Sequence, residues 1–185
     1  MKQKAIFFDR DGTLIKEVHY LNQLSQIELC PGASALSQLK QQGYFLAMVT
    51  NQSGVSRGFF PESFVREAYD AINIQLSAMG ASLDALEYCP HHPEGKAPFN
   101  LGCVCRKPQP GMIHRLSKRF KLDLDSSWVV GDKICDIELG HNAGLQSALV
   151  LTGHGQKERE KVIQKYPHTP VFADIGQFAL HLLQR

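Results

Sequence analysis

Two aspartates near the start of the sequence have a spacing that suggests chemistry. Asp9 and Asp11 flank a single residue after the apolar run Ala5–Phe8, so in an extended segment both side chains lean toward the same face. Two carboxylates that close repel each other and are tolerated when a cation or a proton lies between them. Gly12 permits a sharp turn directly after the pair. The pair predicts a metal-binding or acid–base site, with a turn cap or a surface pair as the alternative.

A second group of candidate ligands lies between residues 89 and 105. Three sulfurs and one imidazole complete a tetrahedral zinc site and leave no open position for a substrate, so the metal would be structural. The four candidate zinc ligands are Cys89, His91, Cys103 and Cys105. His92 is the alternative to His91, and reduced buried cysteines are the alternative to a metal. Residues 93–102 are rich in proline and glycine and poor in apolar side chains, so a metal would hold a segment that packs weakly alone.

Two cations, Arg106 and Lys107, follow the last of these cysteines directly. A loop braced by zinc would direct both side chains toward a bound anion. The formal net charge of the chain is +2. That is too small to indicate nucleic-acid or membrane binding, so we expect neither partner and expect the functional cations to be local.

Short apolar runs alternate with amphipathic stretches along the chain, and they must position these residues. The expected strands are Ala5–Phe8, Phe45–Val49, Leu83–Tyr88, Trp128–Val130, Ala148–Leu151 and Pro170–Ala173. Helices are expected after Pro31, Pro61 and Pro110, between these later strands, and from Ile175. The alternation predicts an α/β fold, a Rossmann-like three-layer sandwich with a mainly parallel sheet. Ligands of such sheets lie beyond the carboxyl ends of the strands, where Asp9, Thr50 and Asp132 are found.

The length of 185 residues is typical of one domain, and we expect residues 1–185 to form a single one with a zinc-loop insert at 89–105. The segment between Thr13 and Pro31 is too short for a large cap domain. A secretory signal pattern is not apparent, so the expected location is cytoplasmic, where thiols stay reduced. Cys30 and Cys135 have no metal-like neighbours in the sequence. A monomer is expected.

The sequence resembles the haloacid dehalogenase superfamily of phosphatases. The motifs are Asp9–Thr13, Val49-Thr50-Asn51, Lys107 before Pro108, and Gly131-Asp132-Lys133 with Asp136 in the next turn. The resemblance implies that Asp9 is the nucleophile and that Asp11 is the general acid and base. It implies Mg²⁺ held by Asp9, the backbone carbonyl of Asp11 and Asp132, and a phosphoryl group held by Thr50 and Lys107. Asp136 is left open between metal ligand and supporting residue.

Four longer sequence segments indicate a more specific resemblance, to the heptose-bisphosphate phosphatases of the histidinol-phosphatase-like group. They are Phe8–Thr13, Thr50–Gly58, Cys89–Pro93 and Cys105–Pro108. The resemblance implies hydrolysis of the C7 phosphate of a heptose 1,7-bisphosphate in the synthesis of lipopolysaccharide cores. The alternatives are a histidinol-phosphate phosphatase and an inactive zinc-stabilised binding module.

The same resemblance implies a set of substrate contacts. Arg57 and Arg106 would hold the second phosphate, because guanidinium groups bind phosphate in a bidentate way. The other implied contacts are Arg10, Glu17, Tyr20, Asn51, Gln52, Ser53 and Lys133. The segment Glu17–Tyr20 departs from the glycine-containing loop of the family.

Overall fold

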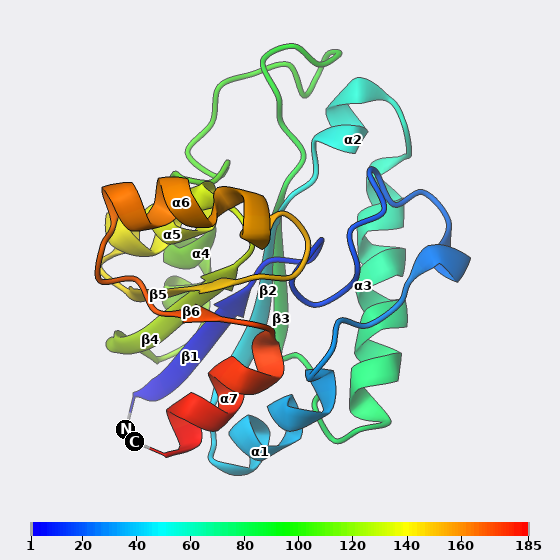
Figure 1. The fold of residues 1–185 in the computed structure, drawn as a ribbon. Coiled ribbons are helices and arrows are strands. Elements are labelled where there is room, and N and C mark those ends of the chain that lie inside the picture. Colours follow the sequence, from blue (N-terminus) through cyan, green and yellow to red (C-terminus); the bar gives the residue numbers. More distant parts are fainter. Residues whose placement is uncertain (1, 185) are drawn as a thin grey trace.

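The computed structural model describes residues 2–184. Within that range six strands form one parallel sheet in the order β3-β2-β1-β4-β5-β6 (Figure 1). The strands are β1 (Gln3–Phe8), β2 (Phe45–Asn51), β3 (Ala85–Cys89), β4 (Leu122–Gly131), β5 (Gln146–Val150) and β6 (Val171–Phe172). The helices are α1 (Leu36–Gln41), α2 (Ser53–Arg57), α3 (Glu62–Ser77), α4 (Gly111–Arg119), α5 (Ile134–Ala143), α6 (Gly155–Lys165) and α7 (Ile175–Leu183).

Helices cover both faces of the sheet and give three layers (Figure 1). Side chains of α1, α3 and α7 pack with Ile6 and Phe8 of β1 on one face. Side chains of α4 and α5 pack with Ala5 and Phe7 on the other. Successive residues of one strand point to opposite faces, so a strand covered on both sides is apolar throughout. The predicted α/β three-layer fold with a parallel sheet is confirmed.

The strand order reverses between β1 and β4, which are neighbours in the centre of the sheet. Phe8 pairs with Val130, so the two strands end side by side. Such a reversal opens a crevice at the carboxyl ends of the strands, where ligands bind in open α/β sheets. The residues that follow these strands, Asp9 and Asp132, are therefore brought together by the topology.

The segment between β1 and α1 contains only short elements among the described residues. They are two 3-10 turns, Leu24–Gln26 and Ala33–Ala35. No cap domain is present in residues 2–184, in agreement with the expectation from the sequence. Across the same residues, no helix has the length and apolar character needed to cross a membrane.

Two elements differ from the sequence-based prediction. Strand β4 begins at Leu122 rather than Trp128, and its first half is polar and partly exposed. Helix α2 was not predicted, because its five residues are too few to show a helical period. Its amino end follows β2 directly and lies at the functional end of the sheet.

Candidate active site

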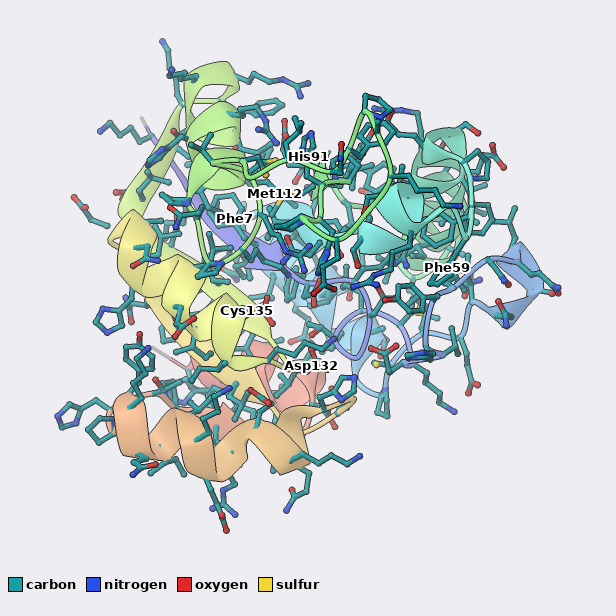
Figure 2. The ribbon with its side chains drawn as sticks, turned by 90° about the horizontal axis from the view of Figure 1, so that it is seen from above. Phe7, Phe59, His91, Met112, Asp132 and Cys135 are labelled. Carbon is teal, nitrogen blue, oxygen red and sulfur yellow. The ribbon has the colours of Figure 1, made fainter. Side chains whose placement is uncertain are left out.

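The residues that follow β1, β2 and β4 surround a cavity of about 270 Å³ at the carboxyl end of the sheet. Figure 2 views the molecule from this side, with Asp132 and Cys135 labelled beside α5. The lining residues are Asp9, Arg10, Asp11, Glu17, His19, Tyr20, Asn51, Gln52, Ser53, Gly54, Arg106, Lys107, Lys133, Cys135 and His154. Most side chains predicted to act in catalysis or substrate binding are thus brought to one place.

Three carboxylates meet beside this cavity, and one of them, Asp9, lines it. One oxygen from each of Asp9, Asp132 and Asp136 lies within 4.8 Å of the others, and all three residues are buried. Among residues 2–184, Asp132 Oδ1 has no hydrogen-bond partner, and Lys133 Nζ lies 3.7 Å away. Burial and the neighbouring charge of Asp9 raise the pKa of Asp132 to about 8. Clustered carboxylates with an unsatisfied buried oxygen fit a hard divalent cation such as Mg²⁺.

Lys107 is the central cation of the site. Its Nζ lies 2.9 Å from Asp9 Oδ1 and 2.6 Å from Asp136 Oδ1, and it donates to the Val49 carbonyl at 3.1 Å. Burial opposes its charge, but Asp136 and Asp9 outweigh burial and raise the pKa of Lys107. Burial by itself would raise the pKa of Asp9. Lys107 and Lys133 outweigh burial and lower this pKa, so Asp9 is ionised.

Asn51 fixes the backbone on which Lys107 stands. The Lys107 N–H donates to Asn51 Oδ1 at 2.9 Å, and Asn51 Nδ2 donates to the Lys107 carbonyl at 3.2 Å. The carboxamide of Asn51 is thus engaged by the protein on both sides. Asn51 lines the cavity, but its observed contacts support Lys107 rather than leave the amide open to a ligand.

Asp11 is held by donors from two directions. Arg10 Nε lies 3.0 and 3.1 Å from its two oxygens, and Gln52 Nε2 donates to Oδ2 at 3.0 Å. Gln52 also donates to Thr50 Oγ1 at 2.9 Å. With its bond to Asp11, Gln52 connects the end of β2 to the segment after β1. Arg10 is only 1% exposed, so its guanidinium group contacts Asp11 inside the protein. Thr50 is buried beside Gln52.

The loop after β5 completes the site, although it carried no recognised motif. The His154 N–H donates to Asp132 Oδ2 at 2.8 Å, and Thr152 Oγ1 donates to the Gly12 carbonyl at 2.6 Å. Gly12 has φ +80°, and a Cβ there would lie 2.2 Å from Asp132 Oδ2. A side chain at Gly12 would therefore displace Asp132, which explains the glycine after the aspartate pair.

Glu17 connects the loop after β1 to the loops that follow β4 and β5. Its Oε2 lies 3.3 Å from both Lys133 Nζ and His154 Nε2, and its Oε1 accepts from the His19 N–H at 2.8 Å. His19 and Tyr20 have φ +47° and +65°, in the left-handed region that favours glycine. The segment that departs from the glycine-containing family loop therefore keeps a glycine-like backbone. The Tyr20 ring packs edge-on against Phe59 with centroids 4.6 Å apart.

The cysteine-rich loop forms a compact ligand cluster. The Sγ atoms of Cys89, Cys103 and Cys105 lie 3.0 to 3.4 Å from one another, and His91 Nδ1 lies 3.4 Å from Cys105 Sγ. Three sulfurs and one ring nitrogen gathered in one place are the ligand set of a structural zinc site. His92 turns away from the cluster, and its ring contacts Arg57. The geometry selects His91 over His92.

The two arginines expected at a second phosphate occupy different places. Arg106 lines the cavity, and its Nη1 donates to the His91 carbonyl at 3.2 Å. Arg57 is not among the lining residues, and its guanidinium reaches His92 and Glu94 instead. The prediction that Arg57 contacts the substrate has no support in this geometry, because the side chain points into the cysteine loop.

Comparison with known proteins places these features in a family. The model of the HAD-hydrolase-like family matches residues 104–178. The D-glycero-beta-D-manno-heptose-1,7-bisphosphate 7-phosphatase of Pasteurella multocida is 38% identical over 91% of this chain and 95% of its own length. A D-glycero-alpha-D-manno-heptose-1,7-bisphosphate 7-phosphatase of Photorhabdus laumondii is 38% identical over 85% and 87%.

The fold comparison agrees with the sequence comparison. The crystal structure of D,D-heptose 1,7-bisphosphate phosphatase from B. bronchiseptica, complexed with magnesium and phosphate, has a TM-score of 0.88 and 33% identity to this chain. The match covers 98% of this chain and 99% of the other. This chain belongs to the HAD-like hydrolases and, within them, to the family of the heptose-1,7-bisphosphate 7-phosphatases.

Proposed function

We propose that this protein hydrolyses the C7 phosphate of D-glycero-D-manno-heptose 1,7-bisphosphate through a phosphorylated Asp9. The observation that carries the proposal is the buried group of Asp9, Asp132 and Lys107, of which Asp9 and Lys107 line the cavity. The family relationship supplies the substrate class. Relatives named for the alpha and for the beta sugar both match this chain.

Magnesium is the metal we propose at the carboxylate cluster. Asp9, Asp132 and the backbone carbonyl of Asp11 would hold it, while the Asp136 carboxylate is engaged by Lys107 and supports the site. When bound, Mg²⁺ supplies positive charge that neutralises the phosphate and lets an anionic nucleophile approach it. A magnesium complex of a related phosphatase supports the choice of metal.

The reaction is carried by the side chains of the chain itself. Both contacts to Asp9 from Arg10 N–H and Lys107 Nζ use Oδ1, which leaves Oδ2 to attack phosphorus. The ester P–O bond then breaks, and the leaving sugar oxygen takes a proton from Asp11. In the second step Asp11 accepts a proton from water, which attacks the phosphorylated Asp9 and releases phosphate. This divides one difficult hydrolysis into two easier displacements.

The remaining predicted residues take two kinds of role in this proposal. Thr50 and Lys107 hold the transferring phosphoryl group, and Arg106 receives the second phosphate at the rim. Contacts to the sugar come from other residues that line the cavity, namely Glu17, Tyr20, Gln52, Ser53 and Lys133. Arg10 and Asn51 act through Asp11 and Lys107 rather than on the substrate.

Zinc is proposed at Cys89, His91, Cys103 and Cys105, with a structural role. Four protein ligands fill a tetrahedral ion and leave no position for substrate. Reduced thiols of this kind are typical of the cytoplasm, where we place the protein as a monomer without nucleic-acid or membrane partners.

Phosphate release from two candidate substrates tests the proposal directly. The heptose 1,7-bisphosphate and histidinol phosphate are compared side by side, each with Mg²⁺ and with chelator. We expect rapid release from the heptose bisphosphate, at least about tenfold slower release from histidinol phosphate, and none with chelator. A preference for histidinol phosphate, or turnover that survives chelation, would refute the proposed activity.

A further inference from the structure

The cysteine-rich loop, residues 89–105, has a second attachment that does not involve its candidate zinc ligands. Residues 92–96 lie against α2, the short helix that begins at the cavity, and Figure 1 shows this loop rising beside α2. The Lys96 N–H donates to the Ser56 carbonyl at 2.6 Å. Gly95 approaches so closely that a Cβ there would lie 2.5 Å from Ser56 Cβ. The backbone of the loop is thus in direct contact with the backbone of α2.

Arg57 adds side-chain contacts at the same place. Its Nη2 lies 3.3 Å from His92 Nε2 and 3.4 Å from Glu94 Oε2. The Arg57 side chain is 30% exposed, while that of Glu94 is 77% exposed. An ion pair this open contributes little by itself. His92 Nδ1 also faces the Glu94 N–H at 3.2 Å, and a neutral imidazole accepts at one nitrogen only, so His92 accepts a hydrogen bond from either Arg57 or this N–H at one time.

The two segments that Arg57 joins both supply the wall of the cavity. Helix α2 contributes Ser53 and Gly54, and the end of the cysteine loop contributes Arg106. Arg106 is itself tied to the loop through the His91 carbonyl. A shift of the loop relative to α2 would therefore change the width of the cavity between Ser53 and Arg106.

We propose that Arg57 is a positioning residue that fixes the cysteine loop to α2 and so sets the cavity wall that both supply. The inference rests on the proposed phosphatase function only in that this wall receives the substrate. It differs from the predicted second-phosphate contact, because the Arg57 guanidinium faces His92 and Glu94 and does not line the cavity.

Hydrogen exchange of the zinc-loaded protein without substrate tests the link. The reporter is the Lys96 amide, whose bond to Ser56 crosses the contact. We expect Arg57→Ala and His92→Ala each to speed its exchange about 2- to 5-fold, and the double variant to add nothing beyond the larger single effect. Arg159→Ala, an exposed arginine on α6, is the matched control and should leave this rate unchanged. Native exchange in Arg57→Ala, or additive effects in the double variant, overturns the proposal.

Kinetics separate positioning from substrate contact. A positioning role predicts that Arg57→Ala lowers kcat/KM by the same factor for the heptose bisphosphate and for p-nitrophenyl phosphate. It also predicts that Arg57→Lys, which can still reach Glu94, recovers part of the loss. A loss confined to the bisphosphate, with unchanged loop exchange, would identify a phosphate contact instead. Because exchange is read without turnover, failure of the proposed activity would leave that result intact.

Discussion

The charges of the buried carboxylate cluster beside the cavity do not balance within the protein. Lys107 contacts both Asp9 and Asp136, so one ammonium group serves two carboxylates. Asp132 is fully buried, and the nearest cation in the described chain, Lys133 Nζ, lies beyond hydrogen-bond distance. Burying an uncompensated carboxylate is costly, so such a group binds a proton or a cation. The raised pKa of Asp132 and its expected role as a metal ligand have this same origin.

Asp9→Asn tests the nucleophile. The amide keeps the size of the side chain but has no anionic oxygen to attack phosphorus, so we expect phosphate release to fall by more than about 10³-fold. The thermal unfolding midpoint should stay close to that of the native protein, because the amide keeps the size of the side chain and Lys107 keeps its ion pair with Asp136. Steady-state phosphate release and a thermal melt are measured together. Substantial residual turnover by a folded variant would rule out Asp9 as the attacking group.

Asp132 makes the stability of the metal-free protein depend on pH. Its folded pKa of about 8 lies above the ordinary value of 3.8, so the folded state holds a proton that the unfolded state has lost between these values. The free energy of unfolding should therefore fall as pH rises toward about 8, with a slope of at most about 1.4 kcal/mol per pH unit.

Asp132→Asn isolates this contribution. The variant cannot titrate at that position, so its free energy of unfolding in chelator should depend less on pH between 5 and 8 than that of the native protein. Denaturant titrations at several pH values give both curves. Parallel curves for the two proteins would contradict the assignment of the proton to Asp132.

Arg106→Ala separates recognition of the second phosphate from the chemistry. A charge-assisted hydrogen bond contributes about 1.5–3 kcal/mol, which predicts a loss of roughly 10- to 150-fold in kcat/KM for the bisphosphate. A simple monophosphate such as p-nitrophenyl phosphate has no second phosphate to lose, so its kcat/KM should fall much less. Equal losses for both substrates would assign Arg106 to loop structure alone.

At the scale of elements, β1 and β4 show how an irregular pairing is accommodated. Their register shifts between Lys4 and Ile6. At that step the Ala5 N–H donates to Ser127 Oγ at 2.8 Å, and the hydroxyl in turn donates to the Asp123 carbonyl at 2.5 Å. A buried backbone donor that would lose its ladder partner is thus satisfied by a side chain. The central pair of strands, which positions Asp9 and Asp132, depends on this hydroxyl.

Ser127→Ala removes that bridge. The Ala5 N–H is then buried without an acceptor, so we expect a loss of about 1–3 kcal/mol in the free energy of unfolding. Ser126→Ala is a matched control, because the neighbouring residue is more exposed. Chemical denaturation of the three proteins gives the difference. A native-like value for Ser127→Ala would show that the strand pair accommodates the lost bond.

The strands were predictable because parallel strands covered on both faces are continuous apolar runs, as in Ala5–Phe8. The polar first half of β4 was missed because it lies at the edge of the core, where burial leaves little pattern. Asp9, Thr50 and Asp132 were predictable from their positions at strand ends. His154 was not, because it holds Asp132 through its backbone N–H, a group that every non-proline residue carries. The position of Arg57 depends on tertiary packing that local sequence does not record.

At the scale of the whole molecule, the fold separates two tasks. The sheet and its helices bring Asp9 and Asp132 together through strand order, without the cysteine loop. The cysteine-rich loop instead positions two cations that line the cavity, Arg106 and Lys107, because they directly follow Cys105. Lys107 is also held by Asn51 at the end of β2. A zinc ion at the predicted site would therefore act on activity through Arg106 and Lys107, and we expect the core to stay folded by its own packing.

Cys103→Ser tests this separation of tasks. A lost thiolate weakens a structural zinc site strongly, so elemental analysis should fall from about one zinc per chain to well below one. Far-UV circular dichroism should keep its native shape, because the apolar core on both faces of the sheet consists mainly of strand and helix residues. The kcat/KM should fall as the loop releases Arg106. Cys30→Ala, which removes a buried thiol outside the cluster, should retain zinc. Unchanged zinc content in Cys103→Ser would remove the proposed ligand set, and collapse of the circular dichroism signal would show that the core depends on the loop after all.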